Sequence, residues 1–202
     1  LIFSLDRYVR VAQCYIRGLQ RLAADGGDLS KVASVASFFV SRVDSEADAR
    51  LAAVGRGDLG GKLAVANAKL AYAEYQRLFS GPAWQELAAK GARPQRPLWA
   101  STSTKNPAYS DVLYVDELIG PDTVNTLPEE TIAAFRDHGS VARTIDRDLA
   151  AAHRAFADVA AADVAYDDVV TVLEAEGVQK FADAFASLLA GIEAKRAVVA
   201  AA

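Results

Sequence analysis

Two short stretches of the sequence each combine a cation with nearby hydroxyl groups. In SVASFFVSRVD, an apolar run ends at Arg42, with Ser37 and Phe39 at alternate positions before it. In WASTSTKNP, a second apolar run is followed by Ser103 and Lys105. Arginine offers phosphate a fork of two donors, lysine a point charge, and serine hydroxyls complete the oxygen shell. The two stretches together would suit a phosphate monoester.

Surface ion pairs give a simpler interpretation of the same residues. Arg42 could pair with Asp44 or Asp48, which follow it closely, and Lys105 could be merely solvated. Exposed pairs of this kind are common and contribute little to stability. Spacing alone therefore leaves both interpretations open.

The phosphate interpretation requires both stretches to end strands of one sheet. Apolar runs predict four strands, at 1–4, 32–40, 98–101 and 122–126, each followed by a helical segment. Alternation of this kind favours a parallel sheet with right-handed crossovers, whose strands deliver their C-terminal ends to one edge. The prolines of RPQRP are expected before the third strand rather than within it.

Helical periodicity and breakers divide the remainder of the chain. The polar, glycine-rich range 44–61 predicts a loop with a short helical piece, and Gly177 is expected to separate the last two helices. The predicted helices span 6–22, 62–79, 83–90, 111–119, 129–138, 143–162, 167–176 and 178–199.

Composition narrows the classes of protein. A length of 202 residues suits one domain, and a net charge of −4 argues against a general nucleic-acid binder or an anionic-membrane binder. No apolar run approaches the roughly 20 residues of a membrane span. A single cysteine, Cys14, excludes an intrachain disulfide and fits the reducing cytoplasm. With two histidines beside it, a structural zinc site is not expected.

Three motifs stand together: LIFS, SVASFFVSRVD and RPLWASTSTKNPAYSDVLYVDELIGPDTVNTLPEET. They resemble the transaldolase family, specifically its longer bacterial branch, and the resemblance extends to EAEGVQKFADAFASLL in the tail. It implies a (β/α)₈ TIM barrel that transfers a dihydroxyacetone unit between sugar phosphates in the pentose phosphate pathway. It also implies a lysine Schiff base, proton-shuttling carboxylates, and no metal or organic cofactor.

By the same resemblance, Ser37, Phe39 and Arg42 belong to the substrate pocket, and Ser103 and Lys105 supply its second phosphate contact. Residues 1–202 then correspond to the C-terminal half of the barrel domain, with strands five to eight and a helical tail. The Schiff-base lysine and the acids fall upstream, so no catalytic residue is expected here and the segment alone should be inactive. The implied partners are sugar-phosphate substrates and the missing N-terminal half.

Two further functions stay open at this point. One is a non-catalytic sugar-phosphate-binding half-barrel module, and the other is a different class I aldolase on the same barrel. In each case half a barrel would leave two open strand edges and a bare apolar face. The isolated segment is therefore expected to be poorly soluble or to self-associate.

Overall fold

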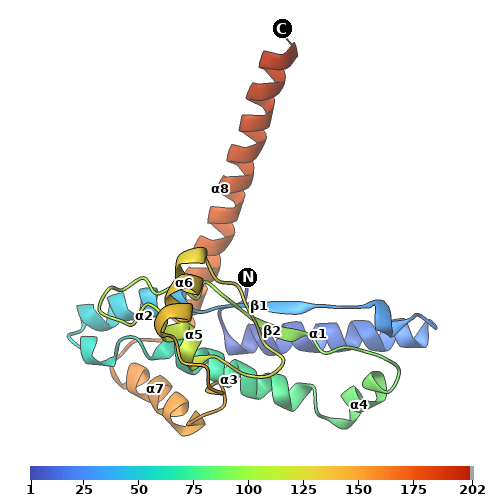
Figure 1. Cartoon of the computed structure of the whole chain (residues 1–202), viewed down its shortest axis with the longest axis horizontal. Helices are drawn as coiled ribbons and strands as arrows, with labels where there is room; N and C mark the ends of the chain where they lie inside the picture. Colours follow the sequence, from blue (N-terminus) through green and yellow to red (C-terminus); the bar gives the residue numbers. More distant parts are fainter. Residues whose placement is uncertain (201–202) are drawn as a thin grey trace.

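Three parallel strands form the sheet, in the order β1 (Val35–Phe39), β2 (Arg96–Ala100) and β3 (Val124–Asn125). The computed structural model describes residues 1–200 and is shown in Figure 1. Instead of the expected strand at 1–4, Ile2 makes one isolated parallel bridge to Phe38. The protein is thus an α/β fold of many helices around a small parallel sheet, and the four-stranded half-barrel is not confirmed.

Strand β2 includes Pro97, which contradicts the expectation that every proline precedes it. The reason is the direction in which this residue points. The Ala100 carbonyl accepts from Val40 of the β1 side, and the Trp99 carbonyl accepts from Thr126 of the β3 side. Alternation places the nitrogen of Pro97 toward β3, where pairing begins only at Leu98. The missing N–H therefore removes no ladder bond.

The helices differ from the expected ones mainly in three places. The range predicted as a loop begins with a 13-residue helix, because Val43, Ala47 and Leu51 form a buried stripe at four-residue steps. The helix expected from 143 begins only at Leu149, capped by the side chain of Asp148. The helices, in chain order, are α1 (Leu5–Ala24), α2 (Ser41–Ala53), α3 (Leu63–Leu78), α4 (Pro82–Ala88), α5 (Leu113–Glu117), α6 (Glu129–His138), α7 (Leu149–Ala161) and α8 (Tyr166–Ala200), with 3₁₀ turns η1 (Leu29–Lys31) and η2 (Gly57–Leu59).

The third difference is that α8 runs unbroken through Gly177. A single glycine inside a helix costs about 1 kcal/mol, which tertiary contacts can offset. A Cβ at this position would lie 3.0 Å from Leu1 Cδ1 and 3.6 Å from Phe3 Cε2. Gly177 therefore lets the helix pass close to the N-terminal segment, and does not end it.

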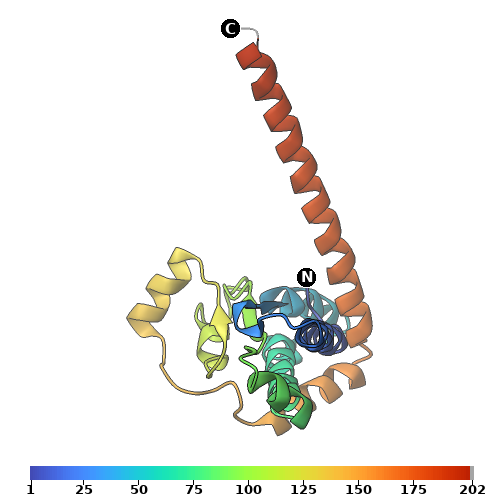
Figure 2. The same ribbon diagram turned by 90° about the vertical axis from the view of Figure 1, so that its right-hand side faces the viewer.

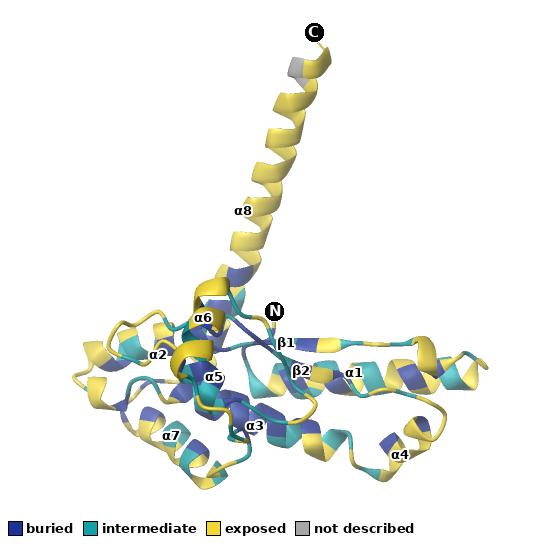
Figure 3. Cartoon of the chain, viewed as in Figure 1, coloured by how far each residue is buried: buried dark blue, intermediate teal, exposed yellow. Residues whose placement is uncertain are grey.

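Helices cover one face of the sheet. Phe38 and Trp99 point into this layer, where their rings make an edge-to-face contact at 6.0 Å and Tyr8 of α1 packs on Phe38 at the same distance. Helix α3 packs beside α1 and against β2. The opposite face carries Ser37, Phe39, Leu98, Val124 and the exposed Val35, so burial is one-sided (Figure 3).

A buried junction joins the N-terminal segment to α3 and α8. The Asn67 amide donates to the Phe3 carbonyl at 2.8 Å and accepts from the Tyr166 hydroxyl at 2.7 Å. That hydroxyl also accepts from the Leu5 N–H at 3.1 Å. Beyond the junction, α8 projects away from the body of the protein (Figures 1 and 2). None of the helices described combines the length and apolar character that a membrane crossing needs.

Candidate functional site

The C-terminal ends of β1 and β2 are joined directly. The Ser41 N–H donates to the Ser101 carbonyl at 2.9 Å, and the two Oγ atoms lie 2.9 Å apart. Ser101 has φ 58°, in the left-handed region that residues other than glycine seldom adopt. This conformation turns the chain out of β2 while its carbonyl still reaches β1. Helix α2, which carries Arg42, and the loop after β2, which carries Lys105, therefore start from one fixed point.

The same edge continues to β3 through Thr102. Its hydroxyl is fully buried and donates to the Asn125 Oδ1 atom at 2.7 Å. The Thr126 N–H donates to the Trp99 carbonyl at 3.2 Å, which extends the pairing beyond the two residues of β3. The sequence prediction did not select Thr102. Its position two residues after the end of β2 is nevertheless a signal that it lies at this edge.

Three of the five predicted site residues lie together. Ser37 and Phe39 are half-buried on the sheet face that the helices leave open, and Arg42 lies in the first turn of α2. The Arg42 Cζ atom is 5.2 Å from the centroid of the Phe39 ring, so the guanidinium rests on the aromatic face. The N-terminal end of α2 adds positive partial charge at the same place.

The surface ion-pair interpretation of Arg42 is wrong for the described part of the chain, because both nearby carboxylates contact other groups. Asp44 accepts from the Ala64 N–H at 2.7 Å and from the Tyr114 hydroxyl at 2.8 Å. Asp48 accepts from the Gly61 N–H at 3.0 Å and from a tyrosine hydroxyl. No carboxylate in residues 1–200 lies within ion-pair distance of Arg42.

Asp44 is a buried carboxylate that sequence reasoning placed only as a possible surface partner. Burial raises its pKa to about 6, against the lowering effect of its bonds to Ala64 and Tyr114. These two bonds connect α2 to the start of α3 and to α5. Asp44 therefore fixes the helix that carries Arg42.

The other two predicted site residues contact each other. The Lys105 ammonium donates to the Ser103 hydroxyl at 2.6 Å in the loop after β2. Lys105 is exposed and makes no ion pair with another described residue. The structure thus places one cation after each of two adjacent parallel strands, joined at Ser41 and Ser101. Whether the two groups act on one ligand stays a prediction.

Helix α8 passes near this edge. The pKa of the exposed Glu176 carboxyl is lowered chiefly by its bond to Lys180 and, to a smaller degree, by the charge of Arg42. An acidic side chain of the tail therefore lies within the electrostatic reach of the candidate cation.

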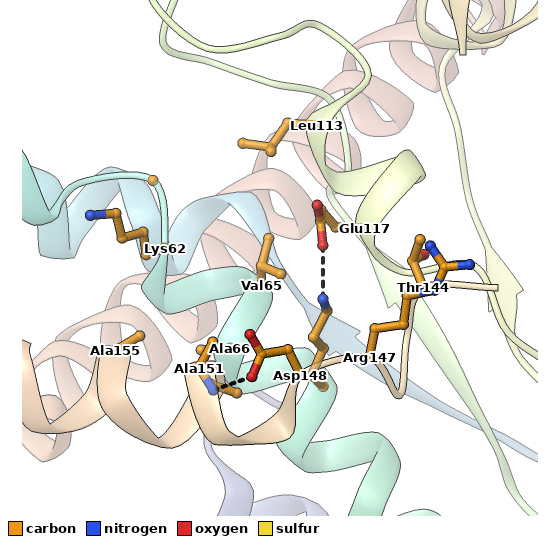
Figure 4. A pocket seen from close by; sticks show the side chains of 13 residues that line it. Lys62, Val65, Ala66, Leu113, Glu117, Thr144, Arg147, Asp148, Ala151 and Ala155 are labelled. Atoms are coloured by element: carbon orange, nitrogen blue, oxygen red, sulfur yellow. Dashed lines mark hydrogen bonds and ion pairs between the residues drawn. The ribbon is translucent and has the colours of Figure 1, made fainter. Parts of the chain in front are cut away.

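A separate hollow of about 480 Å³ lies between α3, α5 and α7 (Figure 4). Its most buried charge, Lys69, donates to Glu117 at 2.8 Å, and Asp148 at its rim caps the first turn of α7. These charges are satisfied within the protein, and the hollow belongs to the helical layer rather than to the strand ends. Within residues 1–200, no three histidine, cysteine or acidic side chains gather as a metal ion would require.

The parallel strands, the surrounding helices and the polar C-terminal edge define an α/β protein with a candidate anion site at the strand ends. The chain belongs to the transaldolase/fructose-6-phosphate aldolase family, whose model matches residues 1–192. This confirms the family that the three sequence motifs indicated.

Curated relatives named transaldolase are similar over almost the whole chain. The protein of Frankia alni is 54% identical over 196 residues, which cover 95% of this chain and 53% of that protein. The protein of a Parafrankia species is 55% identical over 193 residues, and these cover 94% and 52%. Transaldolase 2 of a Nostoc species is 47% identical over 209 residues, with shares of 96% and 55%. The chain therefore spans about half the length of the curated relatives it matches.

Proposed function

We propose that this chain is the substrate-phosphate-binding half of a cytoplasmic transaldolase. In the reaction, a dihydroxyacetone unit passes between sugar phosphates of the pentose phosphate pathway through a Schiff base on a lysine. Ser37, Phe39 and Arg42 bind one side of the phosphate, and Ser103 with Lys105 binds the other. Family membership supports the reaction class.

The observation that carries the site is the placement of Arg42. Its guanidinium rests on Phe39 at the C-terminal end of β1, with no carboxylate partner among the described residues. An arginine that rests on an aromatic ring and has no carboxylate within ion-pair distance among the described residues is available for an anion from solution. Phosphate is the anion that the substrates of this family would bring.

The proposal includes the second half of a (β/α)₈ barrel. Sequential order in the sheet, with Ile2 bridging to the free side of β1, matches successive strands of such a barrel. The open face of the sheet supports the same interpretation, because parallel sheets are normally covered on both sides. The half-length match to relatives agrees with a barrel completed by further chain.

The lysines support a chain that binds but does not form the Schiff base. None of the seven lysines in the sequence lies on a strand. The most buried one, Lys69, lies on α3 and is paired with Glu117. We expect borohydride reduction in the presence of fructose 6-phosphate to leave the mass of this chain unchanged. A covalent adduct on Lys69 or Lys105 would instead favour a different class I aldolase.

The binding test is calorimetric titration of fructose 6-phosphate into the chain combined with the first half of a full-length relative, with wild-type and with Arg42→Ala chains. Loss of one charged contact should cost roughly 2 kcal/mol or more, about a 30-fold weaker affinity. Arg56→Ala is the matched control, because Arg56 is an exposed arginine that is already paired with Asp58. Equal affinity of Arg42→Ala and the wild type, with intact circular dichroism, would remove Arg42 from the site.

A second experiment distinguishes a transaldolase half from a non-catalytic sugar-phosphate-binding module. It measures whether activity appears once the other half of the barrel is supplied. A transaldolase half should restore activity when combined with the first half of a full-length relative. A non-catalytic sugar-phosphate-binding module would bind the phosphate with the same Arg42 dependence and give no turnover in that mixture.

A further inference from the structure

The loop after β2 is bonded to the helix that carries Arg42. The Tyr109 hydroxyl of this loop donates to the Asp48 Oδ2 atom of α2 at 2.8 Å, although 61 residues separate the two in the sequence. The other carboxylate oxygen of Asp48 accepts from the Gly61 N–H at 3.0 Å. Both side chains are half-buried, at the junction of α2, the loop and the start of α3.

Two glycines before α3 leave the space that the Tyr109 side chain occupies. A Cβ at Gly60 would lie 2.7 Å from the tyrosine hydroxyl oxygen, and one at Gly61 would lie 2.8 Å from the ring carbon Cζ. Gly61 also has φ 72°, in the left-handed region that favours glycine. The glycine-rich stretch therefore lets the tyrosine pack directly on the backbone and reach Asp48.

Lys105 lies in the part of the loop that Tyr109 holds. The Thr104 hydroxyl donates to the Ser110 carbonyl at 2.8 Å. The chain between them therefore forms a closed loop that contains both Lys105 and Tyr109. Within it, the Tyr109 N–H donates to the Asn106 carbonyl at 3.1 Å, which adds a turn next to the lysine. A shift of the tyrosine would thus move the backbone of Lys105.

We propose that Asp48 and Tyr109 are positioning residues for the second phosphate contact. This inference rests on the proposed function, in which Arg42 and Lys105 bind the same substrate phosphate. Arg42 lies on α2, and the bond from Tyr109 attaches the loop of Lys105 to the same helix. One helix then sets the separation of the two cations. Because both donors must reach one phosphate, this bond determines how tightly the phosphate is held.

The test uses a full-length chimera, in which the first half of the Frankia alni relative continues into this chain. Tyr109→Phe should raise the KM for fructose 6-phosphate by roughly three- to tenfold, the effect of one lost hydrogen bond, with kcat changed by less than about twofold. In a Lys105→Ala background the same substitution should change KM by less than about twofold, because the side chain it positions is gone. In an Arg42→Ala background its effect should persist.

Glycine variants test the bond without altering either polar residue. Gly60→Ala places a methyl group against the Tyr109 hydroxyl and should raise KM as Tyr109→Phe does. Gly57→Ala meets open space in the same stretch and should leave KM unchanged. Tyr15→Phe is the matched tyrosine control, because it removes a hydroxyl that donates to the Arg93 carbonyl at 2.8 Å and not to α2.

Hydrogen exchange of the same chimera gives a readout that does not depend on turnover. Exchange at the amides of residues 104–110 should accelerate in Tyr109→Phe and stay as in the wild type in Tyr15→Phe. Unchanged exchange in Tyr109→Phe would show that the bond does not hold the loop, and would overturn the inference.

The kinetic results separate this inference from the proposed function. An active chimera in which Tyr109→Phe leaves KM unchanged overturns the positioning role alone. An equal rise of KM in the wild-type and Lys105→Ala backgrounds would show a general structural effect that does not pass through Lys105. A folded wild-type chimera without activity would contradict the proposed function itself, and the inference would fall with it.

Discussion

The hydroxyls of Ser41 and Ser101 lie 2.9 Å apart, although 60 residues separate them in the sequence. This contact joins the first residue of α2, just after β1, to the residue that follows β2, and the chain continues to Arg42 on one side and to Lys105 on the other. Ser41 is almost fully buried. The pair therefore holds together the start of α2 and the loop after β2, on which the proposed phosphate site depends.

Replacing Ser41 by alanine should lower the free energy of unfolding by about 1 kcal/mol, because one partly buried hydrogen bond is lost. Urea denaturation measures the change. Ser187→Ala, on the exposed part of α8, should change stability by less than about 0.5 kcal/mol. If the two variants are equally stable, the Ser41–Ser101 contact contributes nothing to the edge.

Asp44→Asn should change how stability depends on pH. Burial raises the pKa of this carboxyl from 3.8 to about 6 in the folded protein. Between these values the folded state holds the proton more tightly than the unfolded state, so stability falls as pH rises from about 4 to about 6. The part due to Asp44 is at most about 3 kcal/mol, and it should be absent from the asparagine variant.

The measurement for Asp44 is the difference in unfolding free energy between wild type and Asp44→Asn at several pH values. The difference should move in favour of the variant as pH rises through this window and stay constant above it. Parallel curves from pH 4 to 7 would show that Asp44 titrates normally. Other carboxylates cancel in the difference because both proteins contain them.

Asn67→Leu should destabilise the protein by about 2 kcal/mol or more. The substitution leaves the buried Phe3 carbonyl and Tyr166 hydroxyl without their amide partner. Hydrogen exchange should also accelerate at the Leu5 amide, which bonds to that hydroxyl. Gln76→Leu, at an exposed position of the same helix, is the control. Unchanged exchange at Leu5 would contradict the role of the junction.

Gly120→Ala should destabilise by about 1–3 kcal/mol through overpacking. A Cβ at Gly120 would lie 2.1 Å from Cγ2 of Ile145, a fully buried and β-branched residue. Thermal unfolding of Gly120→Ala, Ile145→Ala and the double variant tests this. The double variant should lose less stability than the sum of the losses of the two single variants.

Gly18→Ala is the comparison, because a Cβ at Gly18 in α1 would meet open space. This variant should be neutral or more stable by up to about 1 kcal/mol.

The sequence predicted which segments form the sheet better than it predicted where each strand begins and ends. Apolar runs located β1 and β2, and parallel order followed from the alternation of strands and helices. The run at 1–4 had the same composition, yet it forms only one bridge, because pairing depends on a neighbour that composition does not show. Pro97 is tolerated within β2 because its nitrogen faces β3 at a position where the two strands are not yet paired. Which side a backbone nitrogen faces is known only once the sheet is assembled.

Only a short helical piece was expected where α2 forms 13 residues, because its buried stripe is interrupted by charged residues and followed by glycines. Gly177 was expected to break α8, but the close approach of Leu1 explains why glycine is present. For the site, residue type and position after a strand were sufficient to select Arg42 and Lys105. The contact of Arg42 with Phe39 and the bonds of Thr102 and Asp44 depend on tertiary packing, which no local pattern contains. Assignment of the five residues to phosphate binding stays a prediction.

The bond from the Leu5 amide to the Tyr166 hydroxyl also has a consequence for biosynthesis. Its two partners are 161 residues apart. During translation this bond at the beginning of α1 can therefore form only after Tyr166 has left the ribosome. Until then the neighbouring apolar residues remain accessible to chaperones, and the ribosome-bound intermediate should be more sensitive to proteases near Leu5 than the released protein.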